Sequence, residues 1–189
     1  MLNKEAKIFV ISAPSGTGKS TLIEELLKLR GDLLKTVSYT TRAPRGEEQN
    51  GKDYHFVSIE EFKKLEAAGK FIETAVVYGN LYATSLETIN TSLNNSQNLI
   101  KDIDTQGALN IKKALKDRAV LIFIKPPTLE ELENRLRQRG TDSDAVIRNR
   151  LENAVKEIKE SIKYDYVIVN DSLSNTVLEL KSIVDGYNK

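Results

Sequence analysis

The sequence contains no cysteine and a single histidine, His55. Without cysteine the chain has no disulfide framework, no thiolate metal site and no cysteine nucleophile. One histidine provides too few ligands for a typical zinc site and weakens any interpretation as a Ser-His-Asp hydrolase. We therefore expect His55 to be an ordinary, half-exposed side chain.

The sequence also has little net charge and no long apolar run. Its 28 Lys and Arg residues against 27 Asp and Glu give a formal net charge of +1, which provides no global attraction to nucleic acid or membranes. Residues 1–5 lead directly into a strand pattern, without the apolar core of a signal peptide. We expect no nucleic acid and no membrane as partner, and the cytoplasm as the location.

Strand and helix patterns alternate along the 189 residues, a length sufficient for one domain with a sizeable core. Candidate strands are Lys7–Ser12, Thr36–Tyr39, Asn98–Ile103, Ala119–Ile124 and Tyr166–Val169. The last three are β-branched apolar runs, which is typical of parallel strands covered on both faces. The alternation predicts a doubly wound α/β core with excursions near residues 36–90 and 126–150.

Two helix starts are indicated by capping residues. Ser58 with Glu61, and Thr128 with Glu131, fit the pattern in which a hydroxyl and a carboxylate three residues later cap the first turn. We expect a helix to begin after each hydroxyl.

A glycine-rich loop follows the first candidate strand. Residues 13–20 read A-P-S-G-T-G-K-S and lie between the apolar run 8–11 and a helical pattern. In this context a match to G-x-x-x-x-G-K-[ST] predicts a phosphate site, although Ala13 replaces the first glycine. Backbone amides would bind phosphate oxygens, Lys19 would reach the β- and γ-phosphates, and Ser20 could ligate Mg²⁺. The alternative is an ordinary glycine-rich turn, but the intact G-K-S ending favours a nucleoside triphosphate site.

The segment after the first helix carries two arginines three residues apart. Within residues 38–45, S-Y-T-T-R-A-P-R, Arg42 and Arg45 are braced by a proline and flanked by hydroxyls. Guanidinium groups bind phosphate oxygens in pairs, so both arginines could converge on one dianionic phosphate. Taken alone, the segment also fits a solvated polar loop. Further on, Glu73 and residues 78–85 offer a carboxylate, a tyrosine and a hydroxyl at an expected turn into a helix.

Two carboxylates, Asp102 and Asp104, close the third candidate strand. The carboxyl end of a parallel strand lies at the crevice where α/β sheets bind ligands. Asp102 is the candidate to orient Mg²⁺ or its waters beside Ser20. An aspartate at this place can also be only a helix cap.

Arginines flank a polar turn, residues 140–144, between two expected helices. Phosphoryl transfer needs cations around the transferred group and the exclusion of water, which makes these arginines candidates for a lid. Those on either side of the turn are Arg135, Arg139, Arg148 and Arg150, whereas Arg137 is expected to face water.

Several segments, in the same order, make the sequence resemble guanylate kinase, and the match covers almost the whole chain. They are Ala13–Ser20, T-T-R-x-P-R and N-G-K-D-Y within Ser38–Tyr54, Phe71–Glu73, Gly79-Asn80-x-Tyr82, Asp102-Ile103-Asp104-x-Gln106-Gly107 and Val167–Asp171. One such motif is a weak signal, whereas their common order is specific. The resemblance implies transfer of the γ-phosphoryl group of ATP to GMP, and to dGMP, with Mg²⁺, for guanine nucleotide synthesis and recycling.

Carried over by position, the resemblance implies the following site residues. ATP would be bound by Ala13, Pro14, Ser15, Gly16, Thr17, Gly18, Lys19, Ser20, Thr21 and Asn170. The GMP phosphate would be held by Arg42, Arg45, Tyr54 and Tyr82, and guanine would be read by Ser38, Glu73, Thr84 and Asp104. The catalytic residues would be Lys19, Arg42, Arg135, Arg139 and Arg150, and Mg²⁺ would be held by Ser20 and Asp102.

The resemblance also implies a single domain in three parts. The P-loop core would span about residues 1–35, 91–125 and 151–189, the GMP-binding region 36–90 and the helical lid 126–150. The guanine assignment agrees with hydrogen-bond chemistry, because N1–H and the 2-amino group need acceptors such as Glu73 and Asp104, whereas O6 needs a donor. AMP presents the opposite pattern at that edge and should be rejected.

Other functions stay open at this point. A non-catalytic guanylate-kinase-like binding module is disfavoured by the intact P-loop lysine and lid arginines. A GTPase is disfavoured because residues 110–113 do not supply an N-K-x-D motif. A kinase for another phosphorylated acceptor is the nearer alternative. Four residues depart from the family pattern: Ala13, Leu81, Ala83 and Lys101. The sequence does not indicate an oligomeric state.

Overall fold

The computed structural model of the protein describes residues 5–77, 79–140 and 142–187. Four parts of the predictions lie outside these ranges: residues 1–4 at the N-terminus, Tyr78 in the expected turn, Thr141 in the polar turn, and residues 188–189 at the end of the predicted core. Within the described ranges, no helix is both long enough and apolar enough to span a membrane.

Five parallel strands form the larger sheet, in the order β2-β7-β1-β8-β9. They are β1 (Ile8–Ser12), β2 (Leu34–Lys35), β7 (Leu99–Asp102), β8 (Ala119–Lys125) and β9 (Tyr166–Val169). Because parallel strands end at one common edge, the loops that follow β1, β7 and β9 come together there.

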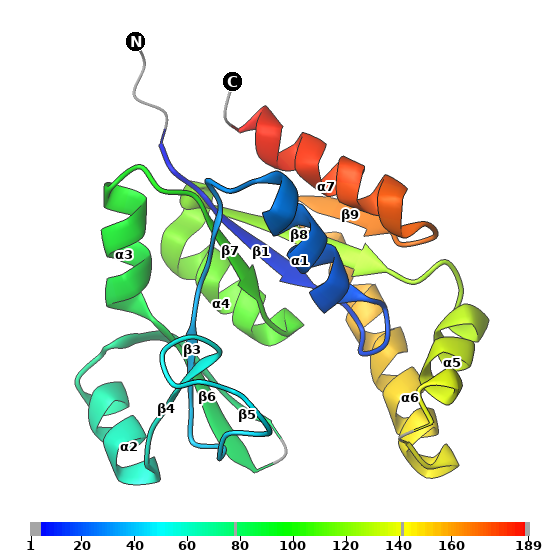
Figure 1. The fold of residues 1–189 in the computed structure, drawn as a ribbon, viewed down its shortest axis with the longest axis horizontal. Coiled ribbons are helices and arrows are strands. Elements are labelled where there is room, and N and C mark those ends of the chain that lie inside the picture. Colours follow the sequence, from blue (N-terminus) through cyan, green and yellow to red (C-terminus); the bar gives the residue numbers. More distant parts are fainter. Residues whose placement is uncertain (1–4, 78, 141, 188–189) are drawn as a thin grey trace.

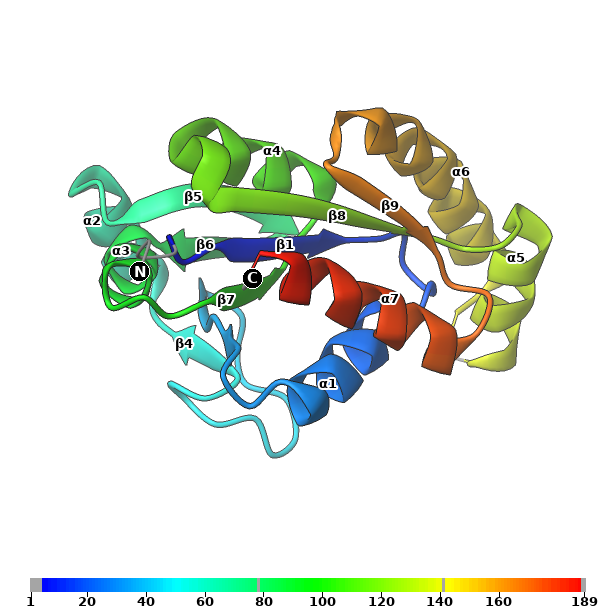
Figure 2. The ribbon, with the colours of Figure 1, turned by 90° about the horizontal axis from the view of Figure 1, so that it is seen from above.

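Helices cover both faces of this sheet (Figure 1, Figure 2). Helices α1 (Lys19–Leu29) and α7 (Leu173–Gly186) cover one face, and α3 (Leu86–Asn94), α4 (Thr105–Leu115) and α6 (Asp144–Glu160) lie on the other. Single 3₁₀ turns at Lys116–Arg118 and Ser161–Lys163 precede β8 and β9. Successive residues of β1 point to opposite faces, so Phe9 and Ile11 enter one core and Ile8 and Val10 the other. The predicted doubly wound α/β fold is confirmed.

A second, smaller sheet lies beside the core, with the strand order β4-β3-β6-β5. Its strands are β3 (Ser38–Thr40), β4 (Tyr54–Phe56), β5 (Phe71–Val77) and β6 (Asn80–Ser85), and α2 (Ile59–Ala67) joins β4 to β5. The ring of Phe62 on α2 packs 4.9 Å from that of Phe71. Antiparallel pairing of β5 with β6 makes a hairpin, and the φ of +78° at Gly79 in its turn is one that glycine adopts readily.

Helix α5 (Leu129–Gln138) and α6 form an arm on the other side of the molecule (Figure 1). The arm has its own apolar cluster, made of Leu132, Leu136, Ile147 and Ala154. Both predicted helix caps are confirmed: the Thr128 hydroxyl accepts from the N–H of Glu131 at 3.0 Å, and Ser58 accepts from Glu61 at 3.1 Å.

Residues 36–39 do not form the single strand expected from the sequence. The N–H of Thr36 donates to the carbonyl of Ile100 on β7, whereas Ser38 pairs with Thr84 in the smaller sheet. The chain thus crosses between the two sheets within this segment, and an apolar pattern alone does not show such a change of partner.

Two further expectations were wrong. Residues 80–85 form strand β6 rather than a turn, and only Ser85 caps the following helix. Strand β9 is not covered on both faces, because it lies at the edge of the sheet and its Val167 and Val169 are 42% and 47% exposed.

Candidate active site

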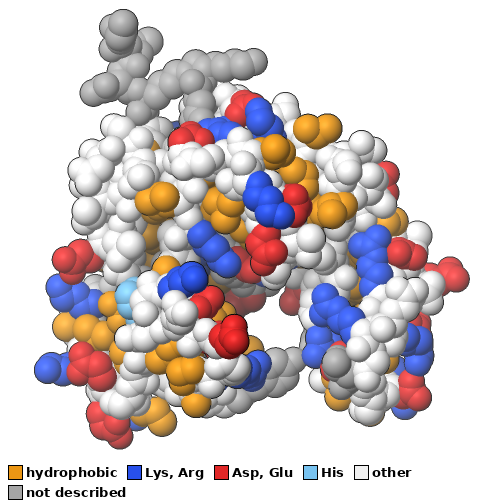
Figure 3. Space-filling view, in the orientation of Figure 1, with side chains coloured by type: hydrophobic (Ala, Val, Ile, Leu, Met, Phe, Trp, Pro, Cys, Tyr) orange, Lys and Arg blue, Asp and Glu red, His pale blue; other side chains and the backbone are white. Residues whose placement is uncertain are grey.

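A hollow separates the smaller sheet from the α5–α6 arm, and basic side chains of the arm border it (Figure 3). Two adjoining cavities of about 370 and 200 Å³ lie at the carboxyl edge of the larger sheet. Three residues line both cavities: Lys19, Asp102 and Asp104. Groups bound in the two cavities would therefore meet at this shared wall.

The larger cavity is built by the loop between β1 and α1. Gly16 and Gly18 have φ of +96° and +95°, where residues with a side chain are strained. A Cβ on Gly16 would also lie 2.8 Å from Cδ2 of Leu136 on α5. The loop amides lie at the positive end of α1, where an anion is favoured. The other lining residues are Ala13, Pro14, Ser15, Ser20, Thr21, Arg139 and Glu157.

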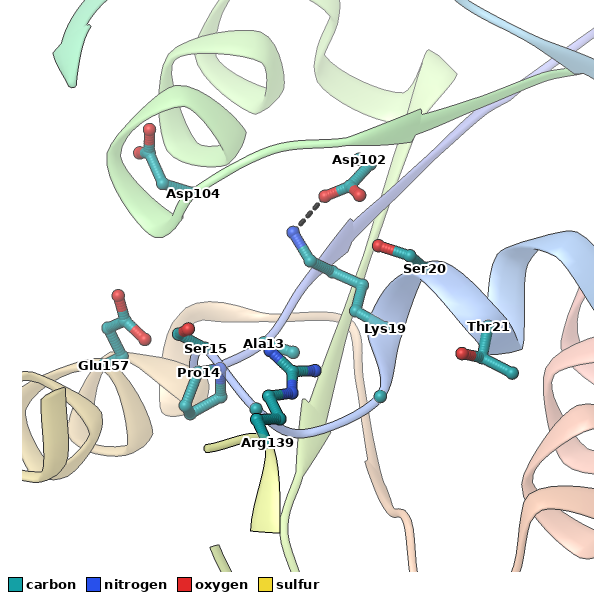
Figure 4. A pocket seen from close by; sticks show the side chains of 12 residues that line it. Ala13, Pro14, Ser15, Lys19, Ser20, Thr21, Asp102, Asp104, Arg139 and Glu157 are labelled. Atoms are coloured by element: carbon teal, nitrogen blue, oxygen red, sulfur yellow. Dashed lines mark hydrogen bonds and ion pairs between the residues drawn. The ribbon is translucent and has the colours of Figure 1, made fainter. Parts of the chain in front are cut away.

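Lys19 forms an ion pair with Asp102 at the end of β7 (Figure 4). Ser20, in the first turn of α1, lies beside this pair. Asp102 is not the helix cap considered from the sequence, because the cap of α4 is Asp104, which accepts from the N–H of Gly107 at 2.9 Å. The structure thus brings together the three side chains predicted to handle phosphate and metal.

Among the described residues no group of three or more His, Cys, Asp or Glu side chains is arranged to hold a metal ion. Mg²⁺ commonly takes only one or two protein oxygens and completes its shell with phosphate oxygens and water. The hydroxyl of Ser20 and the carboxylate of Asp102 fit such a site at the wall of the larger cavity.

The arm places three of the predicted arginines against the glycine-rich loop. Arg135 donates to the carbonyls of Asn170 at 3.3 Å and Thr17 at 3.5 Å, and Arg150 donates to Oγ of Ser15 at 2.6 Å. Arg139 lines the cavity itself. Of the other two, Arg148 is exposed, and Arg137 forms ion pairs with Glu133 and Asp144 at the surface.

Asn170 follows β9 and is only 6% exposed. Its Nδ2 donates to the carbonyl of Thr17 at 2.7 Å, and a Cβ on Gly18 would lie 3.0 Å from the same nitrogen. The amide of Asn170 therefore holds the glycine-rich loop against the end of β9.

If the loop binds ATP, as the resemblance implies, Asn170→Ala is expected to raise KM for ATP about tenfold and to cost about 1 kcal/mol of stability, because the loop loses a buried hydrogen bond. Steady-state kinetics and thermal unfolding measure the two effects. Asn153→Ala, which removes an exposed amide from α6, is the matched control and should change neither. A loss of stability with an unaltered KM would show that Asn170 supports packing only.

One row of paired residues crosses the smaller sheet. Tyr54, Ser38, Thr84 and Glu73 are consecutive partners on β4, β3, β6 and β5. Tyr82, two residues before Thr84, lies on the same face. The smaller cavity is lined by four of these five, namely Ser38, Tyr54, Glu73 and Tyr82. The strand register thus gathers residues that are far apart in the chain and that the resemblance assigned to one ligand.

Glu73 is buried, with 7% exposure, so it is not the surface carboxylate that glutamate usually is. Its Oε1 accepts from the hydroxyl of Thr84, while its Oε2 has no hydrogen-bond partner among the described residues. Burial raises the pKa of the Glu73 carboxyl, and the hydrogen bond from Thr84 and the charge of Lys101 partly oppose this rise. A buried acceptor without a partner is costly, which suits a site where a ligand supplies the donor.

Arg42 and Arg45 do not present two free guanidinium groups to one phosphate position. Glu48 holds Arg42 with two hydrogen bonds of 2.9 Å, and Arg42 lies 5.3 Å from the centre of the Tyr54 ring. The carboxylate of Glu48, followed by Tyr82, raises the pKa of Arg42. Arg45 is exposed, and its backbone N–H donates to Glu48 at 2.8 Å.

Three residues near the cavities escaped the sequence predictions. Glu48 carries no motif that marks it as a partner of Arg42. Glu157, on the polar α6, lines the larger cavity, and burial raises the pKa of its carboxyl against the charge of Lys19. Lys101 was noticed only as a departure from the family pattern; it is 2% exposed, and burial lowers its pKa to about 8.

Comparisons with known proteins point to one family. The family model described as guanylate kinase matches residues 5–187. A guanylate kinase of Geobacter metallireducens is 48% identical over 183 residues, which cover 97% of this chain and 90% of the relative. For a guanylate kinase of Geobacter sulfurreducens the identity is 46%, with the same coverage of 97% and 90%. A crystal structure of guanylate kinase from Anaplasma phagocytophilum aligns with a TM-score of 0.78 and 36% identity over 97% of this chain and 86% of that chain.

Proposed function

The chain belongs to the guanylate kinase family, and we propose that its larger cavity binds ATP and its smaller cavity binds GMP. The protein is an enzyme that transfers the γ-phosphoryl group of ATP to GMP, giving ADP and GDP. The observation that supports this division most is the shared wall of Lys19, Asp102 and Asp104 between the cavities. It would bring the γ-phosphate of one substrate to the phosphate of the other.

At the larger cavity, residues 13–21 would bind the phosphates of ATP through the loop amides and the start of α1. Lys19 would neutralise the β- and γ-phosphates. Arg135, Arg139 and Arg150 would close over the triphosphate from the arm and exclude water. Asn170 would contact the adenine of ATP. It would also hold the loop through its hydrogen bond to Thr17.

Mg²⁺ fits beside Lys19, where Ser20 and Asp102 would hold it. When bound, the ion would neutralise charge on the β- and γ-phosphates. The ion pair of Lys19 with Asp102 keeps the carboxylate directed at this place.

At the smaller cavity, Glu73 and Asp104 would accept hydrogen bonds from N1–H and the 2-amino group of guanine, and the hydroxyls of Ser38 and Thr84 would complete the base site. Arg42, Arg45, Tyr54 and Tyr82 would hold the phosphate. The base and phosphate are the same in GMP and dGMP, so we include dGMP as an acceptor.

The reaction needs no covalent intermediate, because a phosphate oxygen of GMP is itself the nucleophile. It attacks the γ-phosphorus in line, the bond to the β,γ-bridging oxygen breaks, and ADP leaves. The protein's task is to align two polyanions that repel each other and to neutralise them.

ADP formation with Mg-ATP and each of GMP, dGMP, AMP, CMP, UMP and dTMP at equal concentration tests the proposal. We expect turnover with GMP and dGMP alone. Turnover with another acceptor would keep the phosphotransferase and overturn the base assignment. A folded protein without turnover on any acceptor would favour a binding module.

Glu73→Gln is expected to lower kcat/KM for GMP about 100-fold, because an amide N–H₂ would face the donors of guanine. The pH dependence should differ too. Only the ionised carboxyl accepts with both oxygens, and burial raises the pKa of Glu73, so GMP use by the unmodified enzyme should fall as the pH is lowered through that raised pKa.

The phosphate of GMP also titrates, at about pH 6. The ratio of kcat/KM between the unmodified enzyme and the Glu73→Gln variant removes this contribution at each pH. We expect the ratio to shrink towards acid. A constant ratio, or unaltered GMP kinetics of the variant, would contradict the role of Glu73.

The proposed parts of the domain follow the two excursions: a GMP-binding region at about 36–90, a lid at about 126–150, and a core at about 1–35, 91–125 and 151–189. Helix α6 continues past position 150 without a break, so one helix would join the lid to the core. A cytoplasmic location, expected from the sequence, remains part of the proposal.

A further inference from the structure

Lys101 places a buried ammonium group at the smaller cavity. It lies on β7, lines the cavity and is 2% exposed. Its Nζ donates a hydrogen bond to Oγ of Ser38, on β3 of the other sheet. The charges that act on it come from Glu73, Asp102, Lys19 and Lys35. A lysine is rarely buried this completely without a specific partner.

The hydrogen bonds around Lys101 fix which hydroxyl can donate to a ligand. An ammonium group only donates, so Oγ of Ser38 is the acceptor and its own hydrogen remains available. The hydrogen of the Thr84 hydroxyl is already used, because it is donated to Oε1 of Glu73. In this row, Ser38 therefore presents a donor, while Oε2 of Glu73 presents an acceptor that has no partner in the part of the chain that the structure describes.

We propose that Lys101 is a positioning residue that holds Ser38 as a hydrogen-bond donor to the 6-oxo group of the purine. The proposal rests on the proposed function, in which the smaller cavity takes the base of GMP. The ammonium group turns the hydroxyl hydrogen of Ser38 away from itself, which favours an acceptor on the ligand. Guanine supplies its O6, whereas a 6-amino purine would place a second donor against Ser38 and leave both unpaired.

Lys101→Met removes the ammonium group and keeps an unbranched apolar side chain. Without it, the hydrogen of the Ser38 hydroxyl is no longer turned away from β7, so the hydroxyl can rotate and accept from a ligand more readily. We expect KM for GMP to rise about tenfold with kcat within about twofold, and the inhibition constant of IMP, which keeps the 6-oxo group, to rise by the same factor. The phosphate ester of 2,6-diaminopurine riboside should bind no more weakly than before. The preference for GMP over this 6-amino analogue should thus fall about tenfold.

A double-mutant cycle with Ser38→Ala separates this role from a general effect on packing. If Lys101 acts through Ser38, adding Lys101→Met to Ser38→Ala should alter KM for GMP by less than about twofold. Additive effects would show that Lys101 binds the base itself or only supports the fold, and would overturn the proposal. Lys70→Met, which removes an exposed charge just before β5 of the smaller sheet, is the control. It should leave KM for GMP and the inhibition constant of IMP unaltered.

Two further results distinguish a failure of the proposed function from a failure of the role of Lys101. If Ser38→Ala and Glu73→Gln both leave KM for GMP unaltered, the base cavity of the proposed function is wrong. If they raise it while the GMP preference of Lys101→Met is retained, only the role of Lys101 is wrong. Should the Met variant unfold, Lys101→Leu gives a second apolar replacement to which the same criteria apply.

Discussion

Lys19→Ala is expected to lower kcat about 1000-fold, with the fold intact. The ammonium group of Lys19 lies at the wall common to both cavities, where the transferred phosphoryl group would carry its charge. Loss of one preorganised cation or donor at such a place costs about two to three orders of magnitude in rate. Because Lys19 is only partly buried, its removal leaves the core unaltered.

Single-turnover kinetics with Mg-ATP and GMP measure this effect on the chemical step, and circular dichroism and thermal unfolding report on the fold. Lys28→Ala is the matched control, since Lys28 is an exposed lysine near the other end of the same helix. It should retain normal turnover. Near-normal turnover of Lys19→Ala would refute the role of Lys19 and, with it, the assignment of the larger cavity to ATP.

Lys19→Ala also releases Asp102 from its ion pair. Lys19→Arg tests whether a positive charge alone suffices, because it restores the charge with a wider, planar group. We expect it to recover only part of the lost rate. Full recovery would mean that a positive charge at this place suffices and that the fitted shape of the lysine is not needed.

The features that the sequence predicted well are encoded locally. The glycine-rich loop, its flanking strand and helix, and the hydroxyl caps at Ser58 and Thr128 each depend on residues within one short segment. The phosphate chemistry of the loop follows from the backbone conformations of Gly16 and Gly18 and from the start of α1. The signals for such segments lie within a few consecutive residues, so they can be recognised before the neighbours of the segment are known.

The features that the sequence did not predict depend on pairing between distant segments. The row from Tyr54 to Glu73 exists only because β3 pairs with both β4 and β6, and β6 with β5. These strands are short and alternate poorly, so their register could not be derived from the hydrophobic pattern. The partners Glu48 and Lys101 were missed for the same reason: a charge shows its function only once its neighbours are known.

Arg42→Ala is expected to lower kcat/KM for GMP about 1000-fold, because the GMP phosphate would lose the cation that we propose holds it next to the reacting oxygen. Glu48 holds the guanidinium in one plane beside Tyr54, so Arg42 is preorganised rather than free. Arg45→Ala should have a smaller effect, about tenfold, because Arg45 is exposed and its long side chain must be ordered when it binds.

Inhibition by guanosine, which lacks the phosphate, shows whether Arg42 acts on the substrate or on the fold. If Arg42 holds the phosphate, Arg42→Ala should weaken GMP binding strongly and leave guanosine inhibition unaltered. Equal losses for both ligands would show a distorted base cavity.

The double variant Arg42→Ala/Glu48→Ala removes the carboxylate that Arg42→Ala leaves unpaired. Since that carboxylate would repel GMP phosphate, the double variant should bind GMP more tightly than Arg42→Ala alone, yet still far more weakly than the unmodified enzyme.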